Sequence, residues 1–253
     1  MLCRHIGDKR RITCAYPQKN KVEQVLQQVG IFRLLGKEER LTLDADDVIH
    51  WRFIDGALAE GEKANSLIAA FAEKMPESLA RNLYDGLVEA MTNCVHHAYL
   101  EPRDDELQLG LESGWWMFAQ ERDGRLIIVI CDLGIGIPQS LPRTHDAEAV
   151  QSTLERIGRA VRARGYRDVD YLRAALEIGR TRTKLPGRGY GLAQFRQVLE
   201  NTQDGVLRIF SNRGCYTYFR QMGETIERSD EFSTSIRGTL VQWAIPLSNL
   251  VSE

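Results

Sequence analysis

The stretch of sequence that decides the fold is EAMTNCVHHAY, residues 89–99. Glu89, Asn93 and His97 recur every four residues and therefore lie along one side of a helix. A glutamate one turn before an asparagine can accept a proton beside a metal ion that the carboxamide oxygen coordinates. The same spacing is also typical of an ordinary amphipathic helix with three solvated polar residues. The opposite side of the segment is apolar and is expected to face the core, through Leu79, Leu83, Leu87, Met91 and Val95.

The composition predicts a chain with a substantial hydrophobic core. Its 253 residues are 43% hydrophobic and 27% charged, with a net charge of -2, so charge alone indicates neither nucleic acid nor membrane as a partner. The five cysteines lack CxxC spacing, and their odd number argues against a complete disulfide framework. No apolar run approaches the roughly 20 residues that span a bilayer. These features favour a cytoplasmic protein without a membrane segment.

Periodicity indicates alternating helices and strands. Helical spacing covers residues 19–35, 55–74, 76–100, 147–164 and 168–179, and a further helix begins at Leu192. Strands are expected over residues 107–111, 115–121, 125–131, 206–211, 215–220 and 239–245. The predicted fold class is therefore α+β, in a two-layer α/β sandwich. We place a boundary at Pro76 between a small N-terminal region, 1–75, and a domain over 76–253 with an insertion or lid at about 139–186.

One glycine cluster, Gly187-x-Gly189-x-Gly191, stands directly before a predicted helix. Glycines let successive backbone N–H groups approach phosphate oxygens at the positive end of a helix dipole. The spacing is neither that of a P-loop nor that of a dinucleotide-binding fingerprint. A plain tight turn explains this cluster equally well.

A second cluster, Asp132-x-Gly134-x-Gly136, follows a strand that is expected to be buried. A carboxylate at the end of a strand can accept a hydrogen bond from an exocyclic amine, which distinguishes adenine from guanine. The alternative is again a turn, which aspartate and glycine also favour.

Four short motifs occur in one order, and together they resemble the ATP-binding signature of the GHKL superfamily, which includes gyrase, Hsp-type chaperones and histidine kinases. The resemblance covers about Glu77 to Leu247, and the residues 89–99 look most like the corresponding helix of bacterial anti-sigma-factor serine kinases. The four motifs are Glu89-x-x-x-Asn93, Asp132-x-Gly134-x-Gly136, Gly187-x-Gly189-x-Gly191 and Gly238-Thr239.

The resemblance implies a Bergerat-type ATP-binding fold with ATP and Mg²⁺ as ligands. It implies that Asn93 coordinates Mg²⁺ and that Glu89 is the general base, toward water in an ATPase or a serine hydroxyl in a kinase. It also implies that Asp132 accepts from the adenine amine, with Thr239 supporting it through a water. His97 is assigned to packing of the helix or of the adjacent loop.

The remaining residues of the signature are expected to act through the backbone. They turn the chain beneath the base or close it over the triphosphate, with a helix beginning behind them. These residues are Gly134 and Gly136 for the base, Gly187, Gly189 and Gly191 for the triphosphate, and Leu192 for the helix.

Three functions are compatible with these residues. The first is a regulatory switch that binds Mg-ATP and hydrolyses it, the second is a serine or threonine protein kinase of the anti-sigma type, and the third is a nucleotide-binding scaffold without turnover. A protein partner is expected, and the sequence does not identify it. A homodimer is compatible with all three, and nothing in the sequence indicates nucleic acid.

Overall fold

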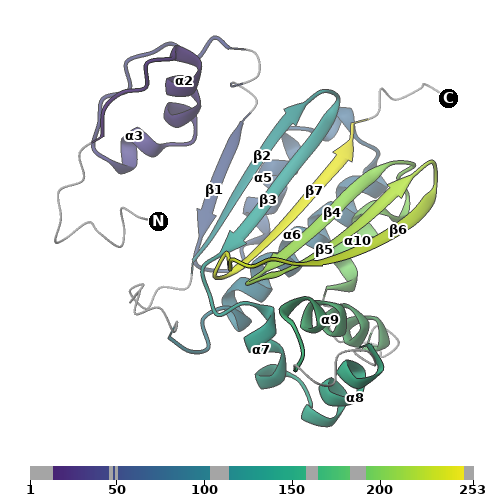
Figure 1. Ribbon diagram of the computed structural model, residues 1–253. Helices are drawn as coiled ribbons and strands as arrows, with labels where there is room; N and C mark the ends of the chain where they lie inside the picture. The colour runs from purple at the N-terminus through teal and green to yellow at the C-terminus, as the bar shows by residue number, and fades with distance from the viewer. Residues whose placement is uncertain are drawn as a thin grey trace.

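The computed structural model describes residues 14–45, 48, 51–102, 114–157, 165–182 and 192–247. A seven-stranded sheet with the order β1-β2-β3-β7-β4-β5-β6 forms its centre (Figure 1). Every neighbouring pair of strands is antiparallel. The expected α+β class is confirmed. The strands are β1 (Arg52–Gly56), β2 (Trp115–Arg122), β3 (Arg125–Asp132), β4 (Gly205–Ser211), β5 (Gly214–Gln221), β6 (Glu224–Glu231) and β7 (Thr239–Pro246).

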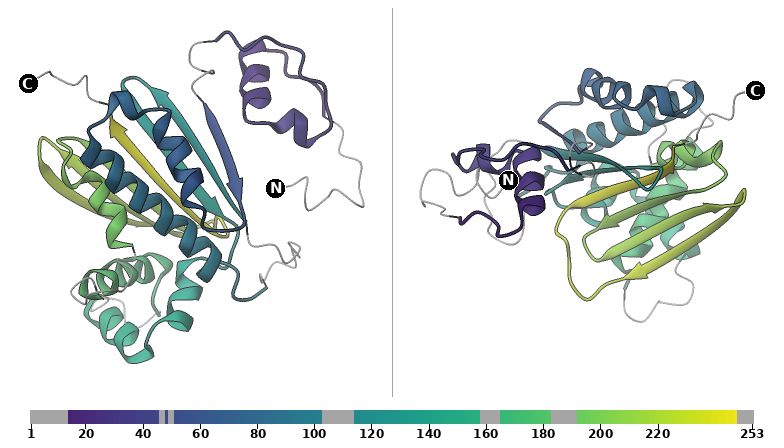
Figure 2. Two further views of the ribbon diagram at one scale, coloured as in Figure 1. Left: turned by 180° about the vertical axis from the view of Figure 1, so that it is seen from behind. Right: turned by 90° about the horizontal axis from the view of Figure 1, so that it is seen from above.

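The helices form three groups around this sheet. Helices α5 (Gly61–Ala69), α6 (Glu77–His97) and α10 (Ala193–Glu200) lie on one face (Figure 2). Helices α7 (Ile137–Thr144), α8 (Ala147–Ile157) and α9 (Asp168–Arg182) gather at the end of the sheet where β3 finishes and β7 starts. A small N-terminal unit beside β1 contains α2 (Asn20–Gln28) and α3 (Ile31–Leu34), and a 3₁₀ turn at Ala72–Lys74 precedes α6.

Helix α6 is the main support of the sheet. Pro76 precedes it with φ -62°, a backbone angle that proline fixes and that suits the start of a helix. The expected apolar stripe is buried at four of its five positions, and Val95 is half-buried. This stripe packs in one continuous core with the inward residues of the strands, including the fully buried Trp243 of β7.

One hairpin turn and one strand insertion set the sheet topology. The β2–β3 hairpin turns at Asp123 and Gly124, whose φ angles of 51° and 68° are the positive values of a type I′ turn. The last strand, β7, inserts between β3 and β4, pairing Cys131 with Leu240 on one side and Ser211 with Thr239 on the other. The ends of β3, β4 and β7 therefore meet at one place.

Several expected boundaries were wrong. The helix expected over 19–35 is interrupted at Gly30, where φ is +76°, a conformation that breaks a right-handed helix. The helix expected over 55–74 is shorter, because Asp55 and Gly56 pair with β2 as part of β1. The strand expected over 107–111 and the end of the helix expected over 147–164 lie outside the described residues.

Two elements were missed because their sequences lack the usual signals. Strand β6 is exposed at every residue except Glu231, so it shows no alternation of apolar and polar residues. Helix α7 has Pro138 in its first turn and Pro142 inside it, and proline inside a helix is disfavoured.

The two sides of the boundary expected at Pro76 share one sheet and one core. Strand β1 pairs with β2, and the buried residues Leu67 and Phe71 pack in the same cluster as Leu83 of α6. None of the described helices is long and apolar enough to cross a membrane.

Replacing Trp243 by alanine should lower the free energy of unfolding by about 3–5 kcal/mol, because a fully buried aromatic side chain leaves a cavity. Its indole Nε1 also donates to the Phe195 carbonyl at 2.9 Å. Denaturant titration measures the change. Trp116→Ala is the matched control, since Trp116 is half-buried on the other face of the sheet, and it should cost less. Equal losses of unfolding free energy in the two variants would contradict the conclusion that the main core lies on the helix-covered face of the sheet.

Candidate functional site

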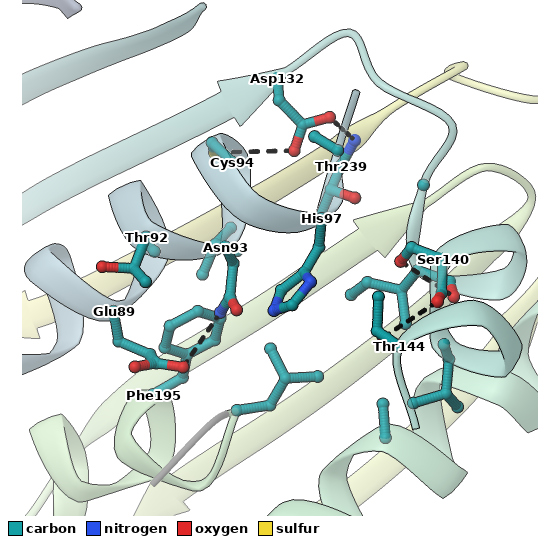
Figure 3. Close-up of a pocket in the computed structure, with 18 of the residues that line it drawn as sticks. Glu89, Thr92, Asn93, Cys94, His97, Asp132, Ser140, Thr144, Phe195 and Thr239 are labelled. Carbon is teal, nitrogen blue, oxygen red and sulfur yellow. Dashed lines mark hydrogen bonds between the residues drawn. The ribbon is translucent and has the colours of Figure 1, made fainter. Parts of the chain in front are cut away.

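A cavity of about 310 Å³ opens between α6, the ends of β3 and β7, and the helices α7, α9 and α10. Figure 3 shows its polar side chains, which come from segments far apart in the sequence. Six of the residues expected from the sequence line it together: Glu89, Asn93, Asp132, Gly136, Leu192 and Thr239. Its apolar walls include Ile130, Leu141, Phe195 and Val241.

Glu89 and Asn93 form a hydrogen-bonded pair on consecutive turns of α6. The Asn93 Nδ2 donates to the Glu89 Oε1 at 3.3 Å, so the Asn93 carboxamide oxygen is directed away from the glutamate. Burial raises the pKa of the Glu89 carboxyl, although the hydrogen bond from Asn93 and the nearby His96 oppose the shift. A carboxylate with a raised pKa holds a proton more readily and suits general base chemistry.

Asp132 is the buried polar centre of the cavity, with a relative exposure of 6%. Its Oδ1 accepts hydrogen bonds from the backbone N–H groups of Gly134 at 2.8 Å and Thr239 at 3.2 Å. The thiol of Cys94 on α6 donates to its Oδ2 at 3.7 Å. The pKa of Cys94 is well above its usual range, first because of burial and then because of the Asp132 charge. The thiol therefore stays protonated and serves as a donor.

The loop after Asp132 is pressed against the end of α6. A Cβ on Gly134 would lie 2.0 Å from the Ala98 carbonyl oxygen, and the N–H of Ile135 donates to that oxygen at 2.7 Å. The Tyr99 hydroxyl accepts from the Leu133 N–H at 3.1 Å. Gly134 therefore permits a close approach of loop and helix. It is not among the residues that line the cavity.

The β4–β5 turn supports the same loop from the other side. Gly136 has φ +79°, and a Cβ there would meet the Asn212 amide at 2.7 Å. The Asn212 Nδ2 donates to the Ile135 carbonyl at 2.9 Å, and its Oδ1 accepts from the Gly238 N–H at 3.3 Å. Asn212 thus joins the β3–α7 loop to the start of β7. Asn212 belongs to none of the four sequence motifs.

Ser211 and Thr239 complete this junction. Their hydroxyl oxygens lie 3.0 Å apart, as directly paired residues of β4 and β7. The Ser211 Oγ also accepts from the Ile137 N–H at the start of α7, at 2.8 Å. Thr239 therefore supports the cavity through Ser211 and its own backbone N–H. The sequence did not indicate Ser211.

His97 lies in the cavity, although the sequence assigned it to packing. Figure 3 shows its ring between α6 and the hydroxyl residues Ser140 and Thr144 of α7. Its Nδ1 is buried and has no hydrogen-bond partner among the described residues. Burial, together with the neighbouring His96, lowers the pKa of His97, so the ring is neutral near pH 7. The hydroxyls of α7 were missed because that helix was not expected.

The expected phosphate-binding glycines, Gly187, Gly189 and Gly191, lie outside the described residues. Leu192, the first described residue after them, lines the cavity just before α10. No group of three or more His, Cys, Asp or Glu side chains suited to a metal ion occurs within the residues that the structure describes.

No protein-family model matches the chain, and no curated protein is significantly similar to it. The superfamily resemblance in the sequence is therefore still an expectation.

Proposed function

We propose that this chain binds Mg-ATP in the cavity and hydrolyses it as a regulatory switch, in a two-layer α/β sandwich of the Bergerat type. One observation carries the proposal. A buried carboxylate, Asp132, and a hydrogen-bonded acid–amide pair, Glu89 and Asn93, line the same cavity. These residues belong to separate motifs of the sequence signature, and the fold brings them together.

The cavity fits a purine base at the end that holds Asp132. Its volume of about 310 Å³ is at the lower end of the range typical of small-molecule sites. Aliphatic side chains such as Ile130 and Val241 provide apolar walls for a flat ring. The buried Asp132 carboxylate provides an acceptor, and a carboxylate accepts hydrogen bonds from an amine but has none to donate to a carbonyl. Adenine is therefore preferred over guanine.

The other end of the cavity fits a hydrated magnesium ion held mainly by phosphates. Magnesium in nucleotide complexes keeps several waters and needs only one or two protein oxygens. Asn93 offers its carboxamide oxygen, because its nitrogen donates to Glu89. When bound, the ion would neutralise charge on the phosphates.

Glu89 acts as the general base in this proposal. In the proposed reaction, water attacks the γ-phosphorus of ATP and gives its proton to Glu89. The bond from the γ-phosphorus to the bridging oxygen breaks, and ADP leaves with that oxygen. The hydrogen bond from Asn93 orients the carboxylate, and burial keeps its pKa above that of a solvated glutamate. A serine hydroxyl in place of water would make the same base serve a protein kinase.

The regulatory role rests on α7. Its Ser140, Leu141 and Thr144 line the cavity, while Gln139 and Arg143 of the same helix are exposed. A ligand in the cavity and a partner at the surface can therefore both contact this helix. If the nucleotide contacts one conformation of α7 more favourably than another, it shifts α7 toward that conformation. The surface that α7 presents to a partner then changes with the nucleotide.

Replacing Glu89 by glutamine should abolish ATP turnover and leave ATP binding largely unchanged, because glutamine keeps the shape but cannot accept the proton. Incubation with ATP labelled at the γ-phosphate measures turnover, and calorimetry with Mg²⁺ measures binding. Free phosphate identifies a hydrolase, and a labelled protein partner identifies a kinase. Undiminished turnover in the variant would remove Glu89 from the base role, and a purified chain that does not bind the nucleotide would refute the proposal.

The same substitution should also change stability with pH. Because burial raises the pKa of Glu89 in the folded state, the folded protein favours the protonated carboxyl. The free energy of unfolding is therefore highest below the ordinary glutamate pKa, and it falls as the pH rises through the folded-state pKa. Glu89→Gln should therefore be more stable than the parent near pH 7 in denaturant titrations. The difference should disappear below the ordinary glutamate pKa. A glutamine variant less stable at pH 7 would contradict the burial of this charge.

Asn93→Ala should weaken ATP binding in the presence of Mg²⁺ by roughly tenfold or more, through loss of a metal-coordinating oxygen. Binding measured with EDTA should change little. Titrations of both proteins with and without Mg²⁺ separate the two effects. An Asn93→Ala protein with unchanged Mg²⁺ dependence would exclude Asn93 as a ligand.

Asp132→Asn should reduce the preference for ATP over GTP, because an amide can donate to a carbonyl as well as accept from an amine. Competition between the two nucleotides measures the ratio. Asp123→Asn, an exposed turn residue, is the matched control and should leave the ratio unchanged. If the Asp132→Asn protein keeps the parent's preference for ATP over GTP, Asp132 does not contact the adenine ring.

A further inference from the structure

Strand β6 forms one edge of the sheet. It pairs with β5 and, among the described residues, with no other strand. Figure 1 shows it at the side of the sheet away from β1. All of its residues except Glu231 are exposed. An edge strand presents a row of backbone N–H and C=O groups that another strand can pair with.

The side chains of β6 on the face away from the helices follow an ordered pattern. Register with Phe219, Thr217 and Cys215 of β5 places Ile226, Arg228 and Asp230 on this face. The pattern continues to Phe232, whose N–H donates to the Arg213 carbonyl at 2.8 Å. The order along the strand is therefore apolar, basic, acidic, apolar.

The two apolar members of this pattern are exposed to solvent. Ile226 has a relative exposure of 40% and Phe232 of 50%. They adjoin apolar side chains of the neighbouring strands, since Ile226 pairs with Phe219 and the Phe232 ring lies 6.2 Å from that of Phe210. The charged members, Arg228 and Asp230, form no ion pair within the described part of the chain; Arg228 stacks on Phe219.

We propose that β6 pairs antiparallel with β6 of a second copy of this chain, with Ser229 at the two-fold axis. Directly opposed residues of an antiparallel pair share one face of a sheet. This register places Arg228 opposite Asp230 of the partner subunit, and Ile226 opposite Phe232 of the partner subunit. The symmetry repeats each contact, so two ion pairs lie between two apolar contacts.

The neighbouring registers lack this complementarity. A two-fold axis at Arg228 opposes two arginines, and an axis at Asp230 opposes two aspartates. On the helix-covered face, the register with Ser229 at the axis places Glu227 opposite Glu231 of the partner subunit. Within each chain these carboxylates already have partners. Arg196 lies 3.3 Å from Glu227, and the Val169 N–H donates to Glu231 at 3.0 Å.

The competing interpretation is a charged edge that prevents pairing, as many exposed edge strands do. Charges of one sign repel when two edges meet, and the helix-covered face of β6 carries carboxylates, Glu227 and Glu231. On the outer face of β6 the two charges are opposite in sign and two residues apart. That spacing makes each strand complementary to its own copy.

The mass of the full chain in solution is the first test. Light scattering should give about twice the 28.8 kDa of one chain. Arg228→Asp should weaken the dimer by roughly tenfold or more, because two pairs of like charges replace two ion pairs. The exchange Arg228→Asp with Asp230→Arg should restore it. Arg122→Asp, an exposed charge reversal at the β2–β3 turn, is the matched control and should leave the mass unchanged.

A cysteine at the axis tests the register. Opposed Cα atoms in an antiparallel pair lie about 4.5–5.5 Å apart, within the range of a disulfide. Ser229→Cys should therefore give a covalent dimer on mild oxidation. Thr225→Cys is the matched control, because the two Thr225 positions would lie eight residues apart along the paired strands, roughly 26 Å. A chain that stays monomeric would overturn the proposal, and so would a dimer that neither responds to Arg228→Asp nor cross-links through Ser229→Cys.

Discussion

The structure depends on the burial of the Asp132 carboxylate where β3 ends. A buried charge is costly unless hydrogen bonds satisfy it. Here the donors come from three places: the loop through Gly134, β7 through the Thr239 N–H, and α6 through Cys94. These donors converge only because β7 inserts between β3 and β4. One polar group thus fixes the relation between the sheet, the main helix and the loop that leads to α7.

This convergence leaves little room for side chains, so glycine occupies the closest contacts. Gly134 faces the Ala98 carbonyl, and a Cβ on Gly238 would lie 2.3 Å from the Asp132 carbonyl oxygen. Close packing therefore explains why two positions of the sequence signature are glycine, without reference to a ligand. The cavity lies immediately beside this tightly packed junction, so the residues that line it are held rigidly. Rigid support of polar groups is a general requirement of binding sites.

The sequence predicts the parts of the fold that follow simple periodicity. The apolar stripe of α6 and the strands β2 and β3 were predicted correctly, and residues such as Glu89, Asp132 and Thr239 do line one cavity. The edge strand β6 and the proline-containing α7 lack that periodicity, so they were missed. The cavity positions of His97 and Ser140 depend on α7, and no pattern near His97 indicates where a separate helix will pack.

Helix α9 connects the cavity to the edge of the sheet. At its start, the Val169 N–H donates to Glu231 of β6, and Asp168 accepts from the Arg213 N–H of the β4–β5 turn. Two to three turns later, Ala175 and Gly179 line the cavity. The helix is buried between these points at Leu172 and Leu176, and a close-packed interior transmits strain. A shift at the β6 edge and a shift at the cavity wall therefore act on the same element, although the two surfaces share no residue.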